Sequence, residues 1–256
     1  MSDGRNFWTR EETILAFELY CTLPEGQDTV KNIEVIKLSE ALGRSVNSVK
    51  LKLQNFKSYD KSYTQQGRIG LKHGSKIDEE VCREFFENWD NLVIETNDIK
   101  IKRGLVPTDA TATESNMTPL GYDKKVLRSE RIGQTFFRRA LLAIYNNKCC
   151  FTGMDVPELL RASHIKPWSE SNDINEKTNP QNGLLLNALC DVAFDNGFIT
   201  ISHDYVIIVS KHLLTNSSCQ YFARINGRKM LLPNKFLPDE KFIEFHNDKF
   251  SRRANE

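Results

Sequence analysis

The stretch ASHIKPW at residues 162–168 is followed by NGLLLNALCDVAFDNG at residues 182–197, and these two segments decide the expected fold. The first is predicted to be a short strand that ends at His164. The apolar run Leu184–Leu186 in the second predicts another strand, and the pattern over Leu189–Asp195 predicts a short helix directly after it. We therefore expect two strands and a helix to lie together.

Three side chains in these segments have chemistry that would fit a single site. Asp191 and Asp195 are four residues apart, so a helix places them on one face, where both could reach one hard cation such as Mg²⁺ or Mn²⁺. His164 could accept a proton near neutral pH. Taken singly, the histidine is more typical of a core residue and the carboxylates of a solvated helix face. Their occurrence together favours a catalytic site.

A longer pattern of four blocks surrounds these residues. It comprises Arg131, Gly133, Gln134, Phe137 and Arg138, then Cys149, Thr152 and Gly153, then the whole of ASHIKPW, and finally Asn182–Leu189 with Asp191, Ala193, Phe194 and Asp195. In this order, the blocks resemble the HNH endonuclease family over residues 131–209. The resemblance covers about a third of the chain.

The resemblance implies an α+β fold built on the ββα-metal motif and the metal-dependent hydrolysis of DNA phosphodiester bonds. His164 would be the general base, and Asn182 would orient it. Asp191 and Asp195 would hold one divalent metal, Mg²⁺ or Mn²⁺ in preference to Zn²⁺ or Ni²⁺. A histidine nearer the C-terminus, His246, could approach this site, but a packing role is the favoured interpretation.

Two positions depart from the related sequences. Cys190 stands where they frequently carry histidine, and Ser163 stands where other branches place a metal ligand. A thiol ligand would favour a softer metal, or the site could have lost its activity. Two alternatives to a DNA endonuclease therefore stay open: a DNA-binding protein with a degenerate site, and an RNase or non-specific toxin nuclease.

Residues 1–95 are predicted to form a small, mostly helical module. Thr9 is a predicted N-cap, Gly43 ends one helix, and Ser45 caps a second helix over Val46–Phe56. This pattern is typical of a helix-turn-helix and loosely resembles Myb/SANT modules. The stretch from Arg44 to Lys76 holds eight basic residues and one acidic residue, which could meet phosphates or form a solvated helical face. Candidate DNA contacts are Arg44, Asn47, Lys50 and Lys52 in this module, and Arg138, Arg139 and Lys166 beside the nuclease blocks.

The remaining expectations concern organisation and location. The polar stretch 96–118 is predicted to be a flexible linker, followed by an HNH domain with a C-terminal extension over 119–256. The chain is 39% hydrophobic and 27% charged, and no apolar run is long enough to cross a bilayer. We expect a cytoplasmic protein that acts on duplex DNA without a membrane, in a restriction or defence role. Whether two copies pair to cut both strands is left open.

Overall fold

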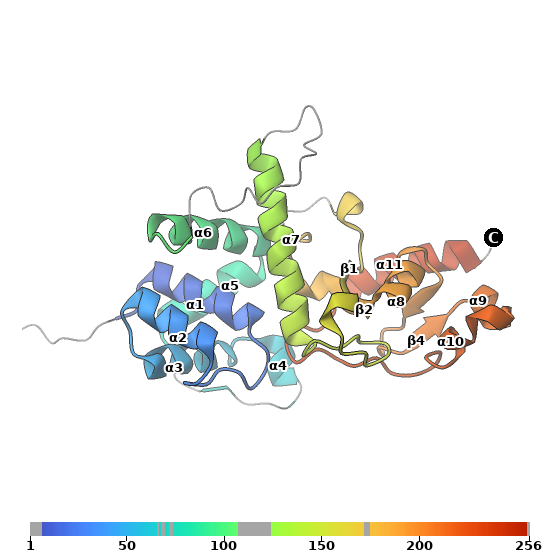
Figure 1. Ribbon diagram of the computed structural model, residues 1–256, viewed down its shortest axis with the longest axis horizontal. Helices are drawn as coiled ribbons and strands as arrows, with labels where there is room; N and C mark the ends of the chain where they lie inside the picture. The colour runs from blue at the N-terminus through green and yellow to red at the C-terminus, as the bar shows by residue number, and fades with distance from the viewer. Residues whose placement is uncertain are drawn as a thin grey trace, which may run out of the picture. The chain divides into compact units, whose positions relative to one another are not determined.

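The computed structural model describes residues 7–65, 67, 70–71, 74–106, 124–171 and 175–254. These residues form helices and two small antiparallel sheets, and they divide into two compact units, residues 1–136 and 137–256. The boundary between the units falls inside one helix, α7 (Lys124–Ile144). Figure 1 colours the chain continuously from blue at the N-terminus to red at the C-terminus.

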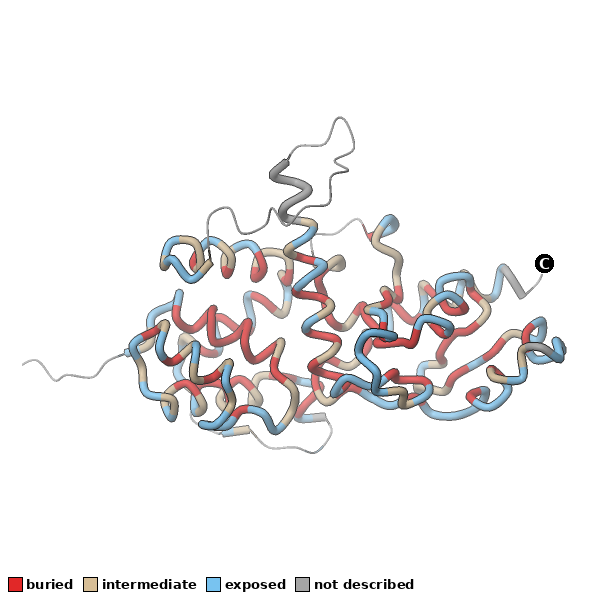
Figure 2. The backbone as a smooth tube through the Cα atoms, viewed as in Figure 1, coloured by how far each residue is buried: buried red, intermediate tan, exposed pale blue. Residues whose placement is uncertain are grey.

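The first unit is helical. Its elements before α7 are α1 (Arg10–Thr22), α2 (Ile33–Leu42), α3 (Val46–Phe56), α4 (Lys61–Gln65), α5 (Lys76–Phe86) and α6 (Trp89–Lys102). Helix α1 is buried along most of its length, as Figure 2 shows in red. Its Phe17 is fully buried and its ring contacts the rings of Phe56, Phe85 and Trp89, so the core of the unit is formed around α1.

The predicted caps of this unit are confirmed. Thr9 and Glu12 form a capping box at the start of α1. Gly43 ends α2 in the left-handed region at φ 61°, and the Ser45 side chain accepts a hydrogen bond from Ser48 N at the start of α3. A glycine relieves the steric cost of that left-handed turn, so only three residues separate α2 from α3.

The helical region extends beyond the predicted boundary at residue 95. Asn88 caps a separate helix, α6, which continues to Lys102. The Asn88 side chain accepts a hydrogen bond from Asn91 N. This bond starts a new helix at Trp89 in competition with the continuation of α5. Helix α6 thus occupies the first part of the stretch 96–118 expected as linker, and positions 107–118 lie outside the described residues.

The second unit contains the two-strand and helix arrangement predicted from the opening segments. Strand β1 (Leu160–His164) pairs antiparallel with β2 (Gly183–Asn187), and His164 lies opposite Gly183. Helix α8 (Ala188–Asp195) begins directly after β2, where the Asn187 side chain accepts hydrogen bonds from the backbone of Leu189 and Cys190.

Short elements and a long helix complete this unit (Figure 1). They are η1 (Pro157–Leu159), η2 (Trp168–Glu170), η3 (Pro180–Asn182), β3 (Ile199–Ile201), β4 (Ile207–Val209), α9 (Lys211–Thr215), η4 (Ser217–Cys219), α10 (Gln220–Ala223) and α11 (Glu240–Ala254). Strands β3 and β4 pair antiparallel, with Ile199 opposite Val209. Among the residues that the structure describes, no helix is both long enough and apolar enough to cross a membrane.

Candidate active site

An open cavity of about 360 Å³ lies where β1 meets α8 in the second unit. Its walls include His164 at the end of β1, and Asp191 and Asp195 from α8. The other lining residues are Arg161, Ala162, Ser163, Pro167, Trp168 and Lys249. The histidine and the two carboxylates that the sequence singled out therefore share one cavity.

The orientation of His164 is fixed on several sides. Its imidazole lies against the Phe137 ring, with centroids 4.0 Å apart and planes 8° apart, and Trp168 meets it edge-on. Its Nε2 is 2.9 Å from the backbone oxygen of Lys177. Because a carbonyl oxygen only accepts, the proton of the neutral ring lies on Nε2 and Nδ1 keeps its lone pair. Burial lowers the pKa of His164, and the bond to Lys177 opposes that shift.

Asn182 braces the loop that follows His164. Its side chain is fully buried, accepts a hydrogen bond from Lys166 N at 2.8 Å, and donates to the carbonyls of Lys166 and Glu176 at 3.1 Å. Glu176 comes directly before Lys177, whose carbonyl oxygen is the hydrogen-bond partner of His164 Nε2. Asn182 is not among the residues that line the cavity, so its contacts fit a positioning role.

The two carboxylates affect each other electrostatically. Partial burial raises the pKa of Asp191, and the Ser163 hydroxyl and the Arg161 guanidinium oppose that rise. Asp195 is exposed overall, but partial desolvation of its carboxyl group and the charge of Asp191 raise its pKa, against the opposing charge of Lys249. Because the pKa of each carboxyl group stays raised despite these opposing groups, the two carboxylates would gain from a shared cation.

The two departures from the related sequences lie in different surroundings. Ser163 lines the cavity, and its buried Oγ has no hydrogen-bond partner of normal geometry, although it lies near enough to Asp191 to influence its pKa. Cys190 is fully buried, and its sulfur contacts Asn187 Nδ2 at 3.5 Å and the Tyr221 hydroxyl at 3.9 Å. It does not line the cavity, so its thiol is not placed with the two carboxylates.

Cys149 is buried beside Cys190 in the core. Its pKa is lowered to about 5, chiefly by a hydrogen bond from the Cys190 thiol, with Thr152 and backbone groups adding to the effect. The same interaction raises the pKa of Cys190. All six cysteines of the chain are free.

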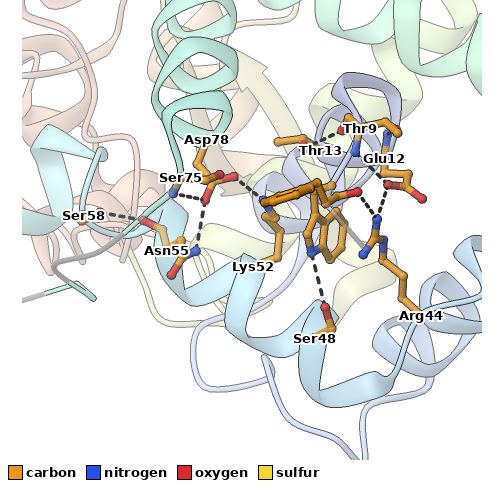
Figure 3. A network of polar contacts seen from close by, with 12 residues as sticks. Thr9, Glu12, Thr13, Arg44, Ser48, Lys52, Asn55, Ser58, Ser75 and Asp78 are labelled. Atoms are coloured by element: carbon orange, nitrogen blue, oxygen red, sulfur yellow. Dashed lines mark hydrogen bonds and ion pairs between the residues drawn. The ribbon is translucent and has the colours of Figure 1, made fainter. Parts of the chain in front are cut away.

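In the first unit, most of the candidate cations have acidic partners. Arg44 forms an ion pair with Glu12 at 2.7 Å. Lys52 forms one with Asp78, which also accepts from Asn55 (Figure 3). Lys52 was a candidate DNA contact, but only 4% of its side chain is exposed, so its ammonium is directed into the unit and not to the surface.

Two aromatic contacts add to this network. The guanidinium of Arg44 lies 4.5 Å from the centre of the Trp8 ring, and the ammonium of Lys52 lies 4.7 Å from it. The basic stretch is thus partly neutralised inside the unit. Asn47 is exposed and Lys50 is half-buried on α3, so these two candidates remain available at the surface.

The candidate DNA contacts beside the nuclease blocks also differ in their exposure and in the bonds that they form. Arg138 donates to the carbonyls of Leu160 at 2.9 Å and Pro157 at 3.2 Å, which ties α7 to the start of β1. Lys166 forms a 2.6 Å ion pair with Glu176. Arg139 is exposed.

Two cations of the cavity, Arg161 and Lys249, were missed from the sequence. A period of two along β1 places Arg161 on the face of Ser163, so that signal was present. Lys249 lies on α11, and its Nζ donates to Asp195 O at 2.8 Å. Nothing local marks it, because 54 residues separate it from Asp195.

A second group of possible metal ligands lies elsewhere in this unit. The ligand atoms of His203, Glu240 and Glu244 lie within 4.8 Å of one another, and all three residues are exposed. His203 already forms a 3.0 Å ion pair with Glu240. This group lacks the general base and the walls of the cavity, but it is a competing cation site that experiments must control for.

Comparison with known proteins agrees with the geometry. A family model described as HNH endonuclease matches residues 149–202, which include β1, β2 and α8. No curated protein matches the chain. The match supports an HNH endonuclease domain, hence a nuclease with a nucleic-acid substrate, and members of the family generally use a divalent metal.

Proposed function

We propose that this chain is a metal-dependent endonuclease that hydrolyses phosphodiester bonds of duplex DNA. The observation that carries the proposal is the single cavity shared by His164, Asp191 and Asp195. The family match supports the nuclease class. To that class the proposal adds DNA as the substrate, a divalent metal as the cofactor, and a biological role.

The residues of the cavity fit one hard divalent cation. Asp191 and Asp195 supply carboxylate oxygens, the ligands that Mg²⁺ and Mn²⁺ prefer. The buried Ser163 hydroxyl, which lacks a partner of normal geometry, faces the same space. The position of Cys190 away from the cavity supports an oxygen-ligated ion over a softer metal. When bound, the ion would stabilise negative charge on the phosphate and on the leaving 3′ oxygen.

In the proposed reaction, His164 Nδ1 takes a proton from a water molecule that attacks the phosphorus atom. The bond between phosphorus and the 3′ oxygen breaks, leaving a 5′-phosphate and a 3′-hydroxyl after that oxygen is protonated. The Nε2–H bond to Lys177 O keeps Nδ1 directed for this task. Asn182 holds the loop that carries this carbonyl, and is therefore a positioning residue.

Two cations of the cavity would meet the substrate's charge. Arg161 is exposed and Lys249 is half-buried, and both border the two carboxylates. One divalent cation balances the two carboxylates, so the phosphate charge is left for these side chains. We propose that they bind the phosphate at the cleaved position.

The first unit is proposed to bind DNA through α3. Asn47 and Lys50 are the candidates that its exposure pattern supports, whereas Arg44 and Lys52 are engaged with Glu12 and Asp78. A helical module that precedes a nuclease domain fits a restriction or defence enzyme. This role rests on analogy of arrangement alone.

The test is digestion of supercoiled plasmid, linear duplex, single-stranded DNA and RNA by the full chain in Mg²⁺, Mn²⁺, Ni²⁺, Zn²⁺ or EDTA. Modified and unmodified plasmids are compared, and the cut ends are mapped. Nicking of duplex DNA in Mg²⁺ or Mn²⁺, absent in EDTA, is the expected result. Cleavage restricted to RNA would favour the ribonuclease alternative. DNA binding without cleavage in every metal would favour a degenerate site.

A further inference from the structure

The last turn of α8 carries Asp195, and its carbonyl oxygens need partners. A helix leaves its last four C=O groups without partners inside the helix. Here Phe198 N bonds Ala193 O at 2.9 Å and Gly197 N bonds Phe194 O at 2.8 Å. Two further donors come from α11: His246 Nε2 lies 3.0 Å from Phe194 O, and Lys249 Nζ lies 2.8 Å from Asp195 O.

His246 is built into the packing between three elements. It is only 2% exposed, and its ring lies on the Phe194 ring with centroids 3.7 Å apart and planes 9° apart. Its Nδ1 is 2.9 Å from Thr200 Oγ1 on β3. Burial lowers the pKa of His246 to about 4, so the ring is neutral at pH 7. Since Phe194 O only accepts, the proton lies on Nε2.

The direction of the Asp195 carboxylate depends on this backbone. The carboxylate forms no ion pair or hydrogen bond with the described residues, and Asp195 is exposed. The last turn of α8 therefore sets the point from which this side chain projects, since no side-chain contact with a described residue holds it. A metal ligand shifted by about 1 Å can cost roughly a hundredfold in rate.

We propose that His246, from outside the segment matched by the family model, is a positioning residue that holds the last turn of α8 through Phe194 O and so sets the place of Asp195 in the metal site. Lys249 adds a second bond from the same helix to Asp195 O. This inference deepens the proposed function and rests on it for the role of the metal. Groups that support a metal ligand in this way typically contribute about 10–100-fold to metal affinity or activity.

The test compares two amides at position 246 in the full chain. In His246→Gln, the side-chain NH₂ lies near the position of Nε2 and can still donate to Phe194 O. In His246→Asn, it lies near the position of Nδ1 and leaves Phe194 O without this donor. The measurements are the Kd for Mn²⁺, kcat and KM for plasmid nicking, hydrogen exchange of Asn196 and Gly197 amides without metal, and the melting temperature.

We expect His246→Asn to raise the Kd for Mn²⁺ about tenfold and to lower kcat by about 10–100-fold, with the KM for DNA unchanged. His246→Gln should remain within about threefold of the wild type. Faster exchange at Asn196 and Gly197 in His246→Asn alone would show that the turn has been released. His212→Ala, an exposed histidine on α9, is the matched control.

Equal Mn²⁺ affinity and exchange in the two amide variants would overturn the inference. Losses of Mn²⁺ affinity that are equal in the two variants and follow their melting temperatures would also overturn the inference. Such losses would indicate a merely structural role. If His246→Asn does not fold, Thr200→Val replaces it. This change keeps the side-chain shape and removes the hydroxyl that contacts His246 Nδ1 and donates to Asn247 Oδ1. It should raise the Kd about threefold, and an unchanged Kd would count against the inference.

The two proposals can fail separately. Mn²⁺ bound through Asp191 without any DNA cleavage would contradict the nuclease proposal, while the affinities of the amide variants would still test His246. DNA cleavage with no Mn²⁺ bound at Asp191 would overturn the positioning inference and leave the nuclease class in place.

Discussion

The imidazole of His164 and the ring of Phe137 lie face to face, 4.0 Å apart between centroids. One ring is the proposed general base, and the other belongs to α7. The contact is possible because Gly183, opposite His164 in the sheet, has no side chain. A Cβ at position 183 would lie 2.7 Å from Phe137 Cζ and 2.7 Å from Leu141 Cδ1. The proposed base is therefore supported by a close approach between β2 and α7.

Gly183→Ala should reduce both stability and cleavage. The added methyl group forces the Phe137 ring to move, at a cost of about 1–3 kcal/mol in the free energy of unfolding, and the ring of His164 loses its support. Chemical denaturation and kcat at saturating DNA measure the two effects. A variant with wild-type stability and kcat would show that the close approach has no bearing on the base.

The pH dependence of kcat should have an acid limb below pH 6.5. Burial lowers the pKa of His164, and the base acts only when its Nδ1 is unprotonated. Activity should therefore be constant above that limb and fall as the pH drops through the lowered pKa. A nearby cation would shift the limb in the same direction. The profile is measured at saturating metal, and a limb centred above pH 7 would contradict the assignment of His164 as a base that acts unprotonated.

Asp191→Asn and Asp195→Asn should each raise the Kd for Mn²⁺ by at least tenfold and abolish measurable nicking. Each change removes an anionic ligand that the proposed site depends on. Isothermal titration of the full chain measures the affinity.

The matched control for these variants is Glu240→Gln combined with Glu244→Gln, which disables the exposed ligand group. It should leave nicking unchanged. If the control abolishes nicking while the aspartate variants retain it, the functional metal lies at the exposed group instead.

Lys52→Met and Lys50→Met should separate structure from DNA binding on α3. Lys52→Met leaves Asp78 buried without its ion-pair partner, which should lower the free energy of unfolding by about 3–5 kcal/mol. Lys50→Met should change it by no more than about 0.5 kcal/mol. If Lys50 contacts phosphate, this change should weaken duplex binding. It should also reduce the slope of the logarithm of the binding constant against the logarithm of salt concentration by about one. Stable Lys50→Met with unchanged DNA binding would remove Lys50 from the interface.

Local sequence patterns were sufficient to predict the strand and the helix that carry the candidate site residues. Strand β1 ends at His164, and α8 holds both carboxylates, because apolar runs and helix periodicity are encoded within a few residues. Gly43 and Ser45 likewise marked the turn before α3 through local backbone chemistry.

Contacts between distant segments could not be predicted in this way. The burial of Lys52 depends on Asp78, 26 residues away, and a basic stretch alone does not reveal acidic partners elsewhere. Lys249 and His246 reach α8 from a helix more than fifty residues further along the chain. The need for glycine at position 183 is likewise set by distant residues, because Gly183 lies in β2 where α7 leaves no room for a side chain.

The central claim is that His164 activates the water that cleaves the phosphodiester bond. Single-turnover nicking of supercoiled plasmid in Mn²⁺ by His164→Ala, compared with the wild type, tests it most directly, with circular dichroism as the check on folding. We predict a folded variant whose rate falls by about 10²–10⁴-fold and is partly restored by added imidazole. A folded His164→Ala chain that nicks DNA at the wild-type rate would contradict the claim.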